Sequence, residues 1–359
     1  MADYLKIFET QADYDSYIAS EYPKPNVSYI EATDTTIFTN YQDGPDGNPY
    51  IIDSALIDDW SATTFHKNAA VLSVTVPEGV TTLENYALQS CPNLTEVSLP
   101  STLTTIGQGA FAQCTSLTEI EIPEGVSTIQ GGNLDAYGTF YRCTALESIT
   151  LPSTITACQQ LAFKMTNALV NVYISDLAAW CGITFHEDNG HPFYTKSFNN
   201  TATHLYLNGT EITDMVIPST VTNIKDYAFI GCNGIETVTV PSSVLTIGKS
   251  VFSGCHGLTS ITFEGGLSSV PMFACNQCTA LKTVDLPSTV TSIGTCAFQG
   301  CNALESFTVR ATTPPTLDRD TFNTVTTPFN IYVPAASVAD YQAASGWSTY
   351  ASQIQAIPA

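Results

Sequence analysis

The sequence predicts a repeat solenoid whose strands stack into one parallel β-sheet. A unit of the form L-x-x-V-x-L-P-x-x-V-x-x-I-x-x-x-A-F-x-x-C recurs, and the steps from Ile235 to Leu258, Leu281 and Leu304 are each 23 residues. A unit this short cannot bury its apolar side alone, so it must stack on its neighbours. Seven cysteines each lie three residues before the Leu or Ile that opens the next unit: Cys91, Cys114, Cys143, Cys232, Cys255, Cys278 and Cys301.

Each unit opens with a short alternating segment that reads as a β-strand and usually ends at Pro, which cannot continue a ladder inside a sheet. We expect four such strands before a break in the pattern and five after it, within residues 72–77, 94–100, 117–123, 146–152, 212–218, 235–241, 258–263, 281–287 and 304–309. The rest of each unit forms an irregular or short-helical convex side. Its core side chains include a predicted aromatic spine of Phe111, Phe140, Phe163, Phe229, Phe252 and Phe298.

Composition and charge exclude several classes of protein. The 359 residues are 44% hydrophobic and 12% charged, which is typical of a soluble globular chain. The formal net charge of −22 repels phosphate backbones and anionic headgroups, so we expect no nucleic-acid partner and no direct membrane insertion. The sequence contains no run of eighteen apolar residues, so no transmembrane helix is predicted. The first six residues lack the pattern of a secretory signal, so a signal was either removed or never present.

The cysteines are interpreted as small buried hydrophobes, not as disulfides or ligands. Seven of the eleven occupy one apolar slot of the repeat. Cys275 and Cys278 form a C-x-x-C pair, but Cys275 stands where other units carry the core Phe, and no second pair or His is in register with it. We therefore expect no metal and no cofactor.

No catalytic constellation stands out in the sequence. His186 and His191 flank a Glu and an Asp, but they are five residues apart and not the four that place two His on one helical face, and Asn189-Gly190 favours a turn. A loop metal site of His186, Asp188 and His191 is the less favoured alternative. No G-x-S-x-G or phosphate-cradling glycine loop is present. The sequence therefore favours a protein that is not an enzyme.

The L-x-x-V-x-L-P…A-F-x-x-C frame, which covers roughly residues 70 to 310, resembles the BspA-type leucine-rich repeat family. The resemblance implies a leucine-rich-repeat solenoid and a non-enzymatic surface or secreted protein that attaches to host proteins or to other cells. The segments 172–181 and 204–209 resemble a recurrent inserted unit of that family, and 331–347 resembles its C-terminal cap. Four residues depart from the frame: Leu88 and Cys275 replace the Phe, Cys158 replaces the Ile, and Thr166 replaces the Cys. Six extra residues also fall between Ile129 and Phe140.

The chain divides by pattern into three parts. Residues 1–68 do not carry the repeat and are predicted to form a β-rich N-terminal cap or attachment domain. Residues 69–310 form the repeats, with the inserted unit at about 175–211, and residues 311–359 form a mixed strand-helix cap. Segments 5–11 and 25–30 also resemble the starts of virion proteins from phages and prophages of gut bacteria. A virion structural or fibre protein attached through residues 1–68 is therefore the alternative function.

Two surfaces are candidates for binding. The outward strand positions carry mostly Ser and Thr, which offer hydrogen bonds or form a solvated sheet. The inserted unit is richer in aromatic side chains, which either bind a ligand or fill a small core of their own. The candidate ligand-binding residues are Tyr173, Trp180, Phe185, His191, Tyr194 and Tyr206. The expected partner is a host protein or glycan outside the cell, or, under the alternative, virion or surface structural proteins.

Overall fold

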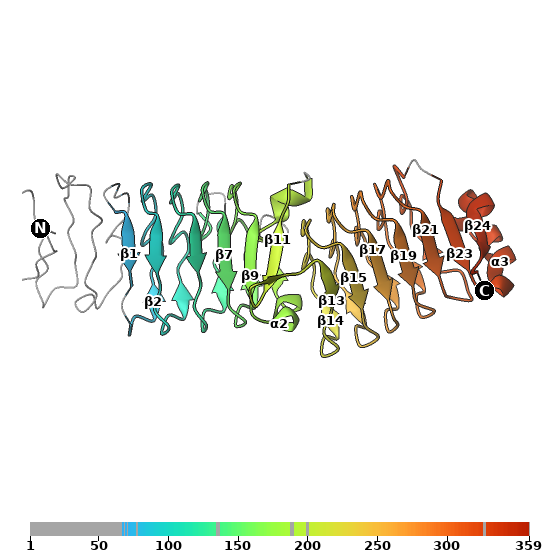
Figure 1. The fold of residues 1–359 in the computed structure, drawn as a ribbon, viewed down its shortest axis with the longest axis horizontal. Coiled ribbons are helices and arrows are strands. Elements are labelled where there is room, and N and C mark those ends of the chain that lie inside the picture. The colour runs from blue at the N-terminus through green and yellow to red at the C-terminus, as the bar shows by residue number, and fades with distance from the viewer. Residues whose placement is uncertain are drawn as a thin grey trace, which may run out of the picture. The chain divides into compact units, whose positions relative to one another are not determined.

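The computed structural model describes residues 67, 69, 71–76, 78–133, 137–186, 190–198, 201–325 and 328–358. The predictions made for residues 1–68 therefore lie outside the described residues, apart from residue 67. The chain splits into two compact units, 1–169 (unit 1) and 170–359 (unit 2). Both consist of stacked parallel strands, and the solenoid has about 12 turns, which confirms the predicted fold class (Figure 1).

Unit 1 stacks two kinds of strand. The longer ones are β1 (Ser73–Thr75), β3 (Glu96–Ser98), β5 (Glu119–Glu121) and β7 (Ser148–Leu151), and the short ones are β2 (Thr82–Leu83), β4 (Thr105–Ile106), β6 (Thr128–Ile129) and β8 (Ala157–Cys158). The pairs β1–β3, β5–β7, β2–β4 and β6–β8 are all parallel. Ser73 pairs with Glu96, 23 residues on, whereas Glu119 pairs with Ser148, 29 residues on. The difference of six equals the extra residues after Ile129, so the insertion lengthens a turn and leaves the strand register intact.

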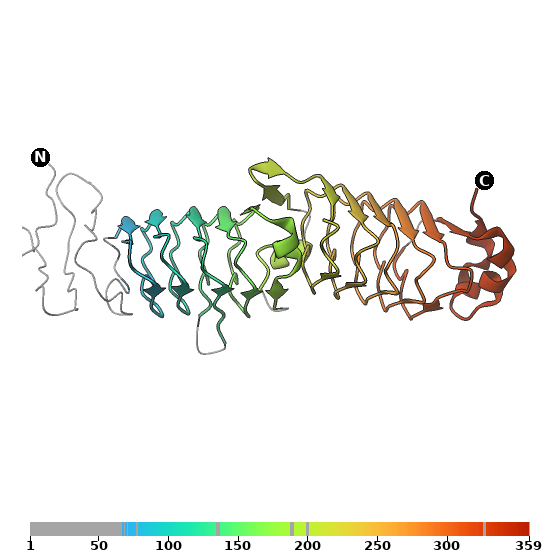
Figure 2. The ribbon, with the colours of Figure 1, turned by 90° about the horizontal axis from the view of Figure 1, so that it is seen from below.

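Unit 2 contains the interruption of the repeat. β9 (Asn171–Ile174) and β11 (His204–Leu207) pair in parallel, and between them lie α2 (Leu177–Cys181), β10 (Thr184–Phe185) and η2 (Tyr194–Phe198). β12 (Thr210–Glu211) then turns back antiparallel onto β11. The tight turn is formed by Asn208 and Gly209, whose φ angles of 51° and 79° suit these two residue types. Figure 2 shows the β11–β12 hairpin standing out from the row of strands.

A new seven-stranded parallel sheet follows this hairpin in unit 2. It consists of β13 (Asp214–Val216), β15 (Thr237–Val240), β17 (Ser260–Phe263), β19 (Thr283–Leu286), β21 (Ser306–Val309), β23 (Asn330–Val333) and β24 (Ile354–Ala356). Short strands form two further ladders, β14 (Asn223–Ile224) with β16 (Thr246–Ile247), and β18 (Ser269–Val270) with β20 (Ser292–Ile293) and β22 (Thr316–Leu317). The prediction of one continuous sheet is therefore wrong, because the antiparallel β12 ends one sheet and β13 begins another.

The predicted aromatic spine is confirmed. All six Phe side chains are at most 2% exposed. Phe140 stacks on Phe111 and on Phe163 with ring centroids 5.6 Å apart in each case, and Phe229 stacks on Phe252 at 5.4 Å. Because the backbone repeats at each turn, identical rings fall one above the next, and stacked rings of this kind add to the free energy of burial.

The seven repeat cysteines are buried and free, as predicted. Five of the thiols donate to a backbone carbonyl 26 or more residues earlier, at the position of the core aromatic ring in a preceding turn. Cys255, for example, donates to the carbonyl of Phe229 at 3.0 Å, and Cys143 donates to that of Phe111 at 3.0 Å. Burial raises the pKa of the Cys143 thiol to about 12. The thiol therefore satisfies a buried carbonyl while it fills an apolar slot.

The convex side is irregular within the regular repeats. Alternate turn residues donate their N–H to the carbonyl of the next unit: Tyr86 to Gln108 and Ser90 to Ala112, at 2.8 and 2.7 Å. Both donors have positive φ, 63° and 59°. The same left-handed position is filled by Gly231, Gly254 and Gly300 in unit 2. These hydrogen bonds satisfy backbone N–H and carbonyl groups of the turns, so the turns need no helix.

The strand ladder of unit 2 continues past residue 310, where the sequence predicts the C-terminal cap to begin, through β23 and β24. η3 (Ala335–Ser337), α3 (Val338–Ala343) and η4 (Trp347–Gln353) cover its end. Tyr341 and Trp347 are fully buried and donate to the carbonyls of Ala311 and Pro315 at 2.8 and 2.7 Å. Among the described residues, no helix has the length and apolar character needed to span a membrane.

Candidate binding surface

The outward face of the long-strand ladder in unit 2 is lined mostly by small polar side chains, in two columns. Several of them bond to one another along the ladder: the Thr237 hydroxyl donates to Asp214 at 2.7 Å, and the Thr283 hydroxyl donates to Ser260 at 2.8 Å. The columns are Asp214, Thr237, Ser260, Thr283, Ser306 and Asn330, and Val216, Thr239, Thr262, Asp285, Thr308 and Tyr332. Hydroxyls engaged in this way are less available to a ligand.

Threonines at the turns also serve the fold. Thr95, Thr104, Thr259 and Thr291 each donate a hydroxyl hydrogen to a carbonyl 23 residues earlier, at 2.9 to 3.1 Å. Hydrogen bonds between successive turns therefore explain part of the high Ser and Thr content. The hydroxyl-rich composition does not by itself indicate a binding surface.

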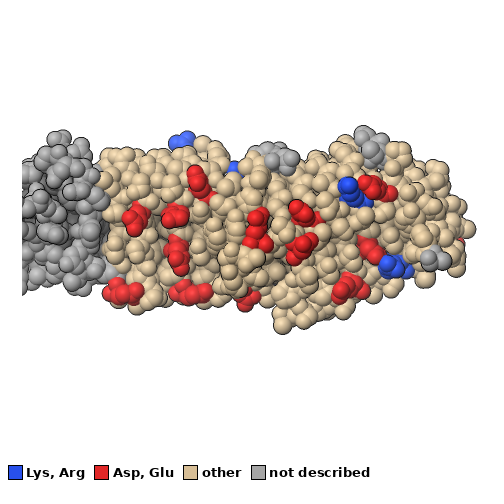
Figure 3. Space-filling model, in the orientation of Figure 1, with Lys and Arg blue, Asp and Glu red and all other residues tan. Residues whose placement is uncertain are grey.

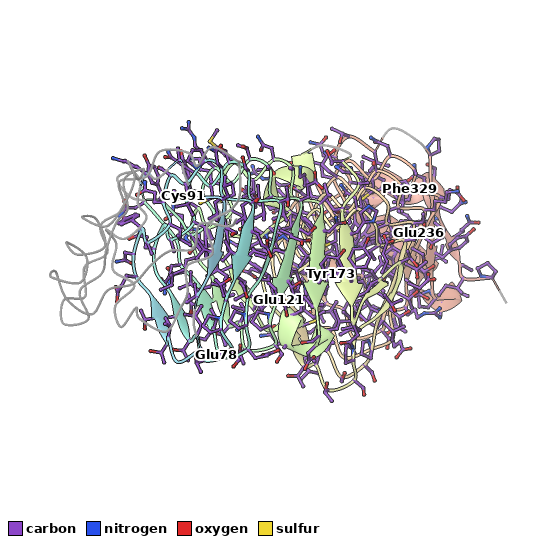
Figure 4. The ribbon with its side chains drawn as sticks, turned by 60° about the vertical axis from the view of Figure 1, so that its left-hand side comes forward. Glu78, Cys91, Glu121, Tyr173, Glu236 and Phe329 are labelled. Atoms are coloured by element: carbon purple, nitrogen blue, oxygen red, sulfur yellow. The ribbon has the colours of Figure 1, made fainter. Side chains whose placement is uncertain are left out.

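Two aromatic side chains on the outward face come from β9 and β11 and contact each other. Tyr173 and Tyr206 are register partners on these parallel strands, and their rings stack with centroids 4.5 Å apart at 15°. Both side chains are half-buried. Figure 4 labels Tyr173 on its strand. The pair is a two-ring surface held by a hydrogen-bonded sheet, which limits the entropy lost when a ligand binds.

A polar pair, His204 and Glu211, lies beside these rings. His204 Nδ1 and a carboxylate oxygen of Glu211 are 2.5 Å apart, each side chain about one-third exposed at 34%. The His204 ring centroid is 6.2 Å from that of Tyr206. Partial burial raises the pKa of the Tyr206 phenol, and the charge of Glu211 raises it further. The phenol therefore remains a hydrogen-bond donor at neutral pH.

Three other predicted binding residues lie in the interior of the inserted unit. Trp180, Phe185 and His191 are at most 3% exposed, and their rings contact one another, with centroids 4.5 to 5.6 Å apart. Trp180 Nε1 donates to the carbonyl of Ala228 at 2.8 Å. The sequence left two roles open for these residues, ligand binding or a small core within the inserted unit. In the structure the three side chains form such a core. Their burial removes them from the surface that a ligand meets.

His191 is held as a neutral ring. Its Nδ1 accepts from the N–H of Phe193 at 3.0 Å, so Nε2 carries the proton and donates to the Ala228 carbonyl at 3.2 Å. Burial lowers the pKa of His191 to about 3. Both ring nitrogens are engaged in hydrogen bonds, so His191 does not serve the alternative metal site with His186 and Asp188. Asp188 lies outside the described residues. Within the described part of the chain, no group of three or more His, Cys, Asp or Glu is arranged to hold a metal ion.

Tyr194 opens η2 and is half-buried. It comes from a different segment than the stacked pair, and no ring contact joins it to Tyr173 or Tyr206 in the described residues. The sequence did indicate which of these aromatic residues face outward and which are buried. Tyr173 and Tyr206 alternate with buried Val172, Ile174 and Leu205, a period of two that points the tyrosines outward. Trp180, in contrast, follows the helix N-cap Asp176, which accepts from two backbone N–H groups and starts α2 with Trp180 on its buried side.

The repeat architecture defines the class of protein. The family model of the BspA-type leucine-rich repeat region, in six copies, matches residues 59–186 and 200–327. The chain belongs to the BspA-type leucine-rich repeat family. Proteins with leucine-rich repeats are generally binding modules without enzymatic activity. No curated protein sequence matches the chain.

Several solved structures are similar to this chain. A leucine-rich cell surface protein from Faecalibacterium prausnitzii shares 24% identity over 82% of this chain and 79% of its own, with a TM-score of 0.45. The pneumococcal vaccine antigen PcpA shares 16% identity over 88% and 89%, with a TM-score of 0.45. A leucine-rich repeat protein from Bacteroides ovatus shares 16% identity over 94% and 100%, with a TM-score of 0.44.

Proposed function

We propose that the protein is a non-enzymatic recognition module that acts outside the cell and binds a host protein or glycan. The binding surface is the outward face of β9 and β11, centred on Tyr173 and Tyr206. The observation that carries this proposal is the stacking of these two rings at 4.5 Å on a rigid parallel ladder. Membership of a family of binding modules supports it.

The chemistry around the tyrosine pair suits recognition of a polar ligand. Stacked rings supply apolar contact area with few rotatable bonds, and their hydroxyls donate and accept hydrogen bonds. His204 and Glu211 place two further polar groups next to Tyr206. Sugars and peptides both present apolar faces together with hydroxyl or amide groups, so this surface fits either kind of ligand.

The experiment measures binding of the full chain to an array of oligosaccharides and to a panel of purified extracellular host proteins. Tyr206→Ala and Tyr173→Ala are each expected to weaken binding to the best probe by at least about tenfold, as buried aromatic contacts at binding sites do. Because both side chains are half-buried on the surface, the thermal midpoint is expected to change little.

Tyr332→Ala is the matched control. Tyr332 also points outward, from β23 of the same unit, but it has no ring partner among the described residues. Its loss is expected to leave binding unchanged. Equal weakening by all three substitutions, or binding that survives loss of both Tyr173 and Tyr206, contradicts the proposed surface.

The virion alternative depends on attachment through residues 1–68, which lie outside the described residues apart from residue 67. It stays a prediction, and native mass measurement of the full chain tests it, because a fibre or particle component assembles symmetrically.

A further inference from the structure

A second aromatic surface lies on the convex turns of unit 1, away from the residues that the sequence marks as candidates for ligand binding. We call it the tyrosine–arginine strip and define it by Tyr86, Tyr137, Tyr141, Arg142, Lys164 and Met165. All six are at least partly exposed. Tyrosine and arginine are the residue types that contribute most to binding free energy at protein interfaces.

The strip is continuous from one turn to the next. The Tyr86 ring lies over Gly109: a Cβ built there would fall 2.5 Å from the ring, so only glycine admits this packing. The same Cβ would lie 3.4 Å from the Tyr137 carbonyl. The Tyr137 and Tyr141 rings stack with centroids 4.7 Å apart.

Arg142 extends the strip toward the C-terminal end of unit 1. Its guanidinium carbon lies 5.6 Å from the centroid of the Tyr141 ring, and its Nε donates to the sulfur of Met165 at 3.3 Å. The Arg142 N–H also donates to the carbonyl of Lys164 at 2.9 Å, which places the two cationic residues on adjacent turns. The Arg142 charge therefore lies beside the stacked tyrosines, and Lys164 is on the adjacent turn.

These two cations are unusual in their surroundings. Between residues 68 and 169 the sequence has eight Asp or Glu, and Arg142 and Lys164 are its only Lys or Arg. Figure 3 shows the same imbalance on one face, where acidic side chains are spread widely and basic ones are few. Yet within the described residues neither Arg142 nor Lys164 forms an ion pair.

Two cations of unit 2 are paired differently. Arg310 makes a bidentate pair with Asp285 at 2.7 and 2.8 Å, and Lys282 lies 3.7 Å from Glu305. An acidic protein that pairs these cations internally leaves Arg142 and Lys164 open to a carboxylate from outside. With Nε engaged by Met165, the Nη donors of the Arg142 guanidinium are available for such a group.

The way the rings are used favours a peptide over a sugar. A sugar stacks on an open ring face, but the Tyr141 ring already has Tyr137 stacked on it and the Arg142 guanidinium above it. On the Tyr141 ring the edge and the hydroxyl remain, and such groups contact apolar side chains and carboxylates. We propose that the tyrosine–arginine strip is an interaction surface for an acidic peptide segment of a partner protein, with Arg142 and Lys164 bound to its carboxylates and the tyrosines to its apolar side chains.

The test uses the full chain and a fluorescein-labelled synthetic peptide of Glu, Leu and Phe, read by fluorescence anisotropy. The same peptide with every Glu replaced by Gln is the charge control. Binding of the Glu peptide is expected to weaken at least about tenfold for Arg142→Ala and for Tyr141→Ala, and to weaken as salt is raised. The Gln peptide is expected to bind at least about tenfold more weakly.

Lys282→Ala is the matched control variant, because it removes one exposed positive charge from unit 2 without touching the strip. Its affinity for the Glu peptide is expected to equal that of the unaltered chain. The proposal is overturned if Lys282→Ala and Arg142→Ala weaken binding equally, if the Glu and Gln peptides bind alike, or if no Glu peptide binds. Arg142-dependent binding of polysialic acid in place of the peptide also overturns it. Tyr173→Ala leaves this assay unchanged, so its outcome is separate from that of the proposed function.

Discussion

Replacing Phe140 by Ala tests how strongly the aromatic spine holds the turns of unit 1 together. Phe140 is 0% exposed and stacks on Phe111 and Phe163, both at 5.6 Å. A buried Phe side chain removes roughly 150–200 Å² from water, which at about 25 cal/mol per Å² corresponds to about 4–5 kcal/mol. Ala retains a small part of this, and the cavity adds a cost, so we expect a loss of about 3–5 kcal/mol.

The assay is urea denaturation followed by far-ultraviolet circular dichroism, combined with hydrogen exchange to locate the loss. In a repeat protein each turn contacts only its neighbours, so protection should fall most in the turns that carry Phe111, Phe140 and Phe163. Exchange in the turns around Phe252 of unit 2 is the internal reference.

Phe140→Leu is the matched control, because Leu88 already occupies the spine position of an earlier turn and is fully buried there. An exchange between large apolar side chains usually costs less than about 1.5 kcal/mol. If Phe140→Ala and Phe140→Leu destabilise equally, or if the Ala variant loses less than about 1 kcal/mol, the spine does not carry the packing energy assigned to it.

Three further predictions concern thiols, pH and glycine. Cys296 is the one cysteine not fully buried, so 5,5′-dithiobis-(2-nitrobenzoic acid) should modify about one thiol rapidly in the native chain and the rest only on unfolding; rapid reaction of many thiols contradicts the buried ladder. His191 has a folded-state pKa near 3 against 6.5 when unfolded, so the unfolded state binds the extra proton between these values. Stability should therefore fall on acidification from about pH 6.5 to 3, and His191→Gln should flatten that slope in pH-dependent urea titrations. Gly254→Ala should be far more destabilising than Gly79→Ala in thermal melts. Both have positive φ, which costs about 1–2 kcal/mol for Ala, but only at Gly254 would the Cβ lie 2.4 Å from a backbone oxygen, that of Ser197. Similar melting shifts for the two glycine variants would show that steric contact is unimportant there.

Much of the repeat could be predicted because it depends on local periodicity. Alternation by two points Val74 inward and Thr75 outward, and the 23-residue step aligns residues such as Ser73 and Glu96 across the ladder. The Phe and Cys slots recur once per turn, so stacking brings like residues together without further information. The interruption was harder to predict, because a two-residue turn at Asn208-Gly209 decides where one sheet ends.

The candidate site was predicted only in part, since composition does not distinguish a buried aromatic residue from an exposed one. Trp180 and Tyr173 are seven residues apart in an aromatic-rich segment, yet one lies on the buried side of α2 and the other on the outer face of β9. The secondary structure of each segment decides which aromatic residue is buried, and Asp176 stabilises the start of α2 by capping it.

The sequence by itself determined the period of the solenoid, the residues that face its core and the family to which it belongs, because each of these repeats with the chain. Only the tertiary structure decided which side chains from different turns meet. Tyr173 meets Tyr206 because parallel pairing places them in register although they are 33 positions apart in the sequence. Tyr86 lies over Gly109 because stacked turns bring a bare Cα beneath its ring. Such contacts depend on distances between backbones of separate turns, which no local pattern in the sequence records.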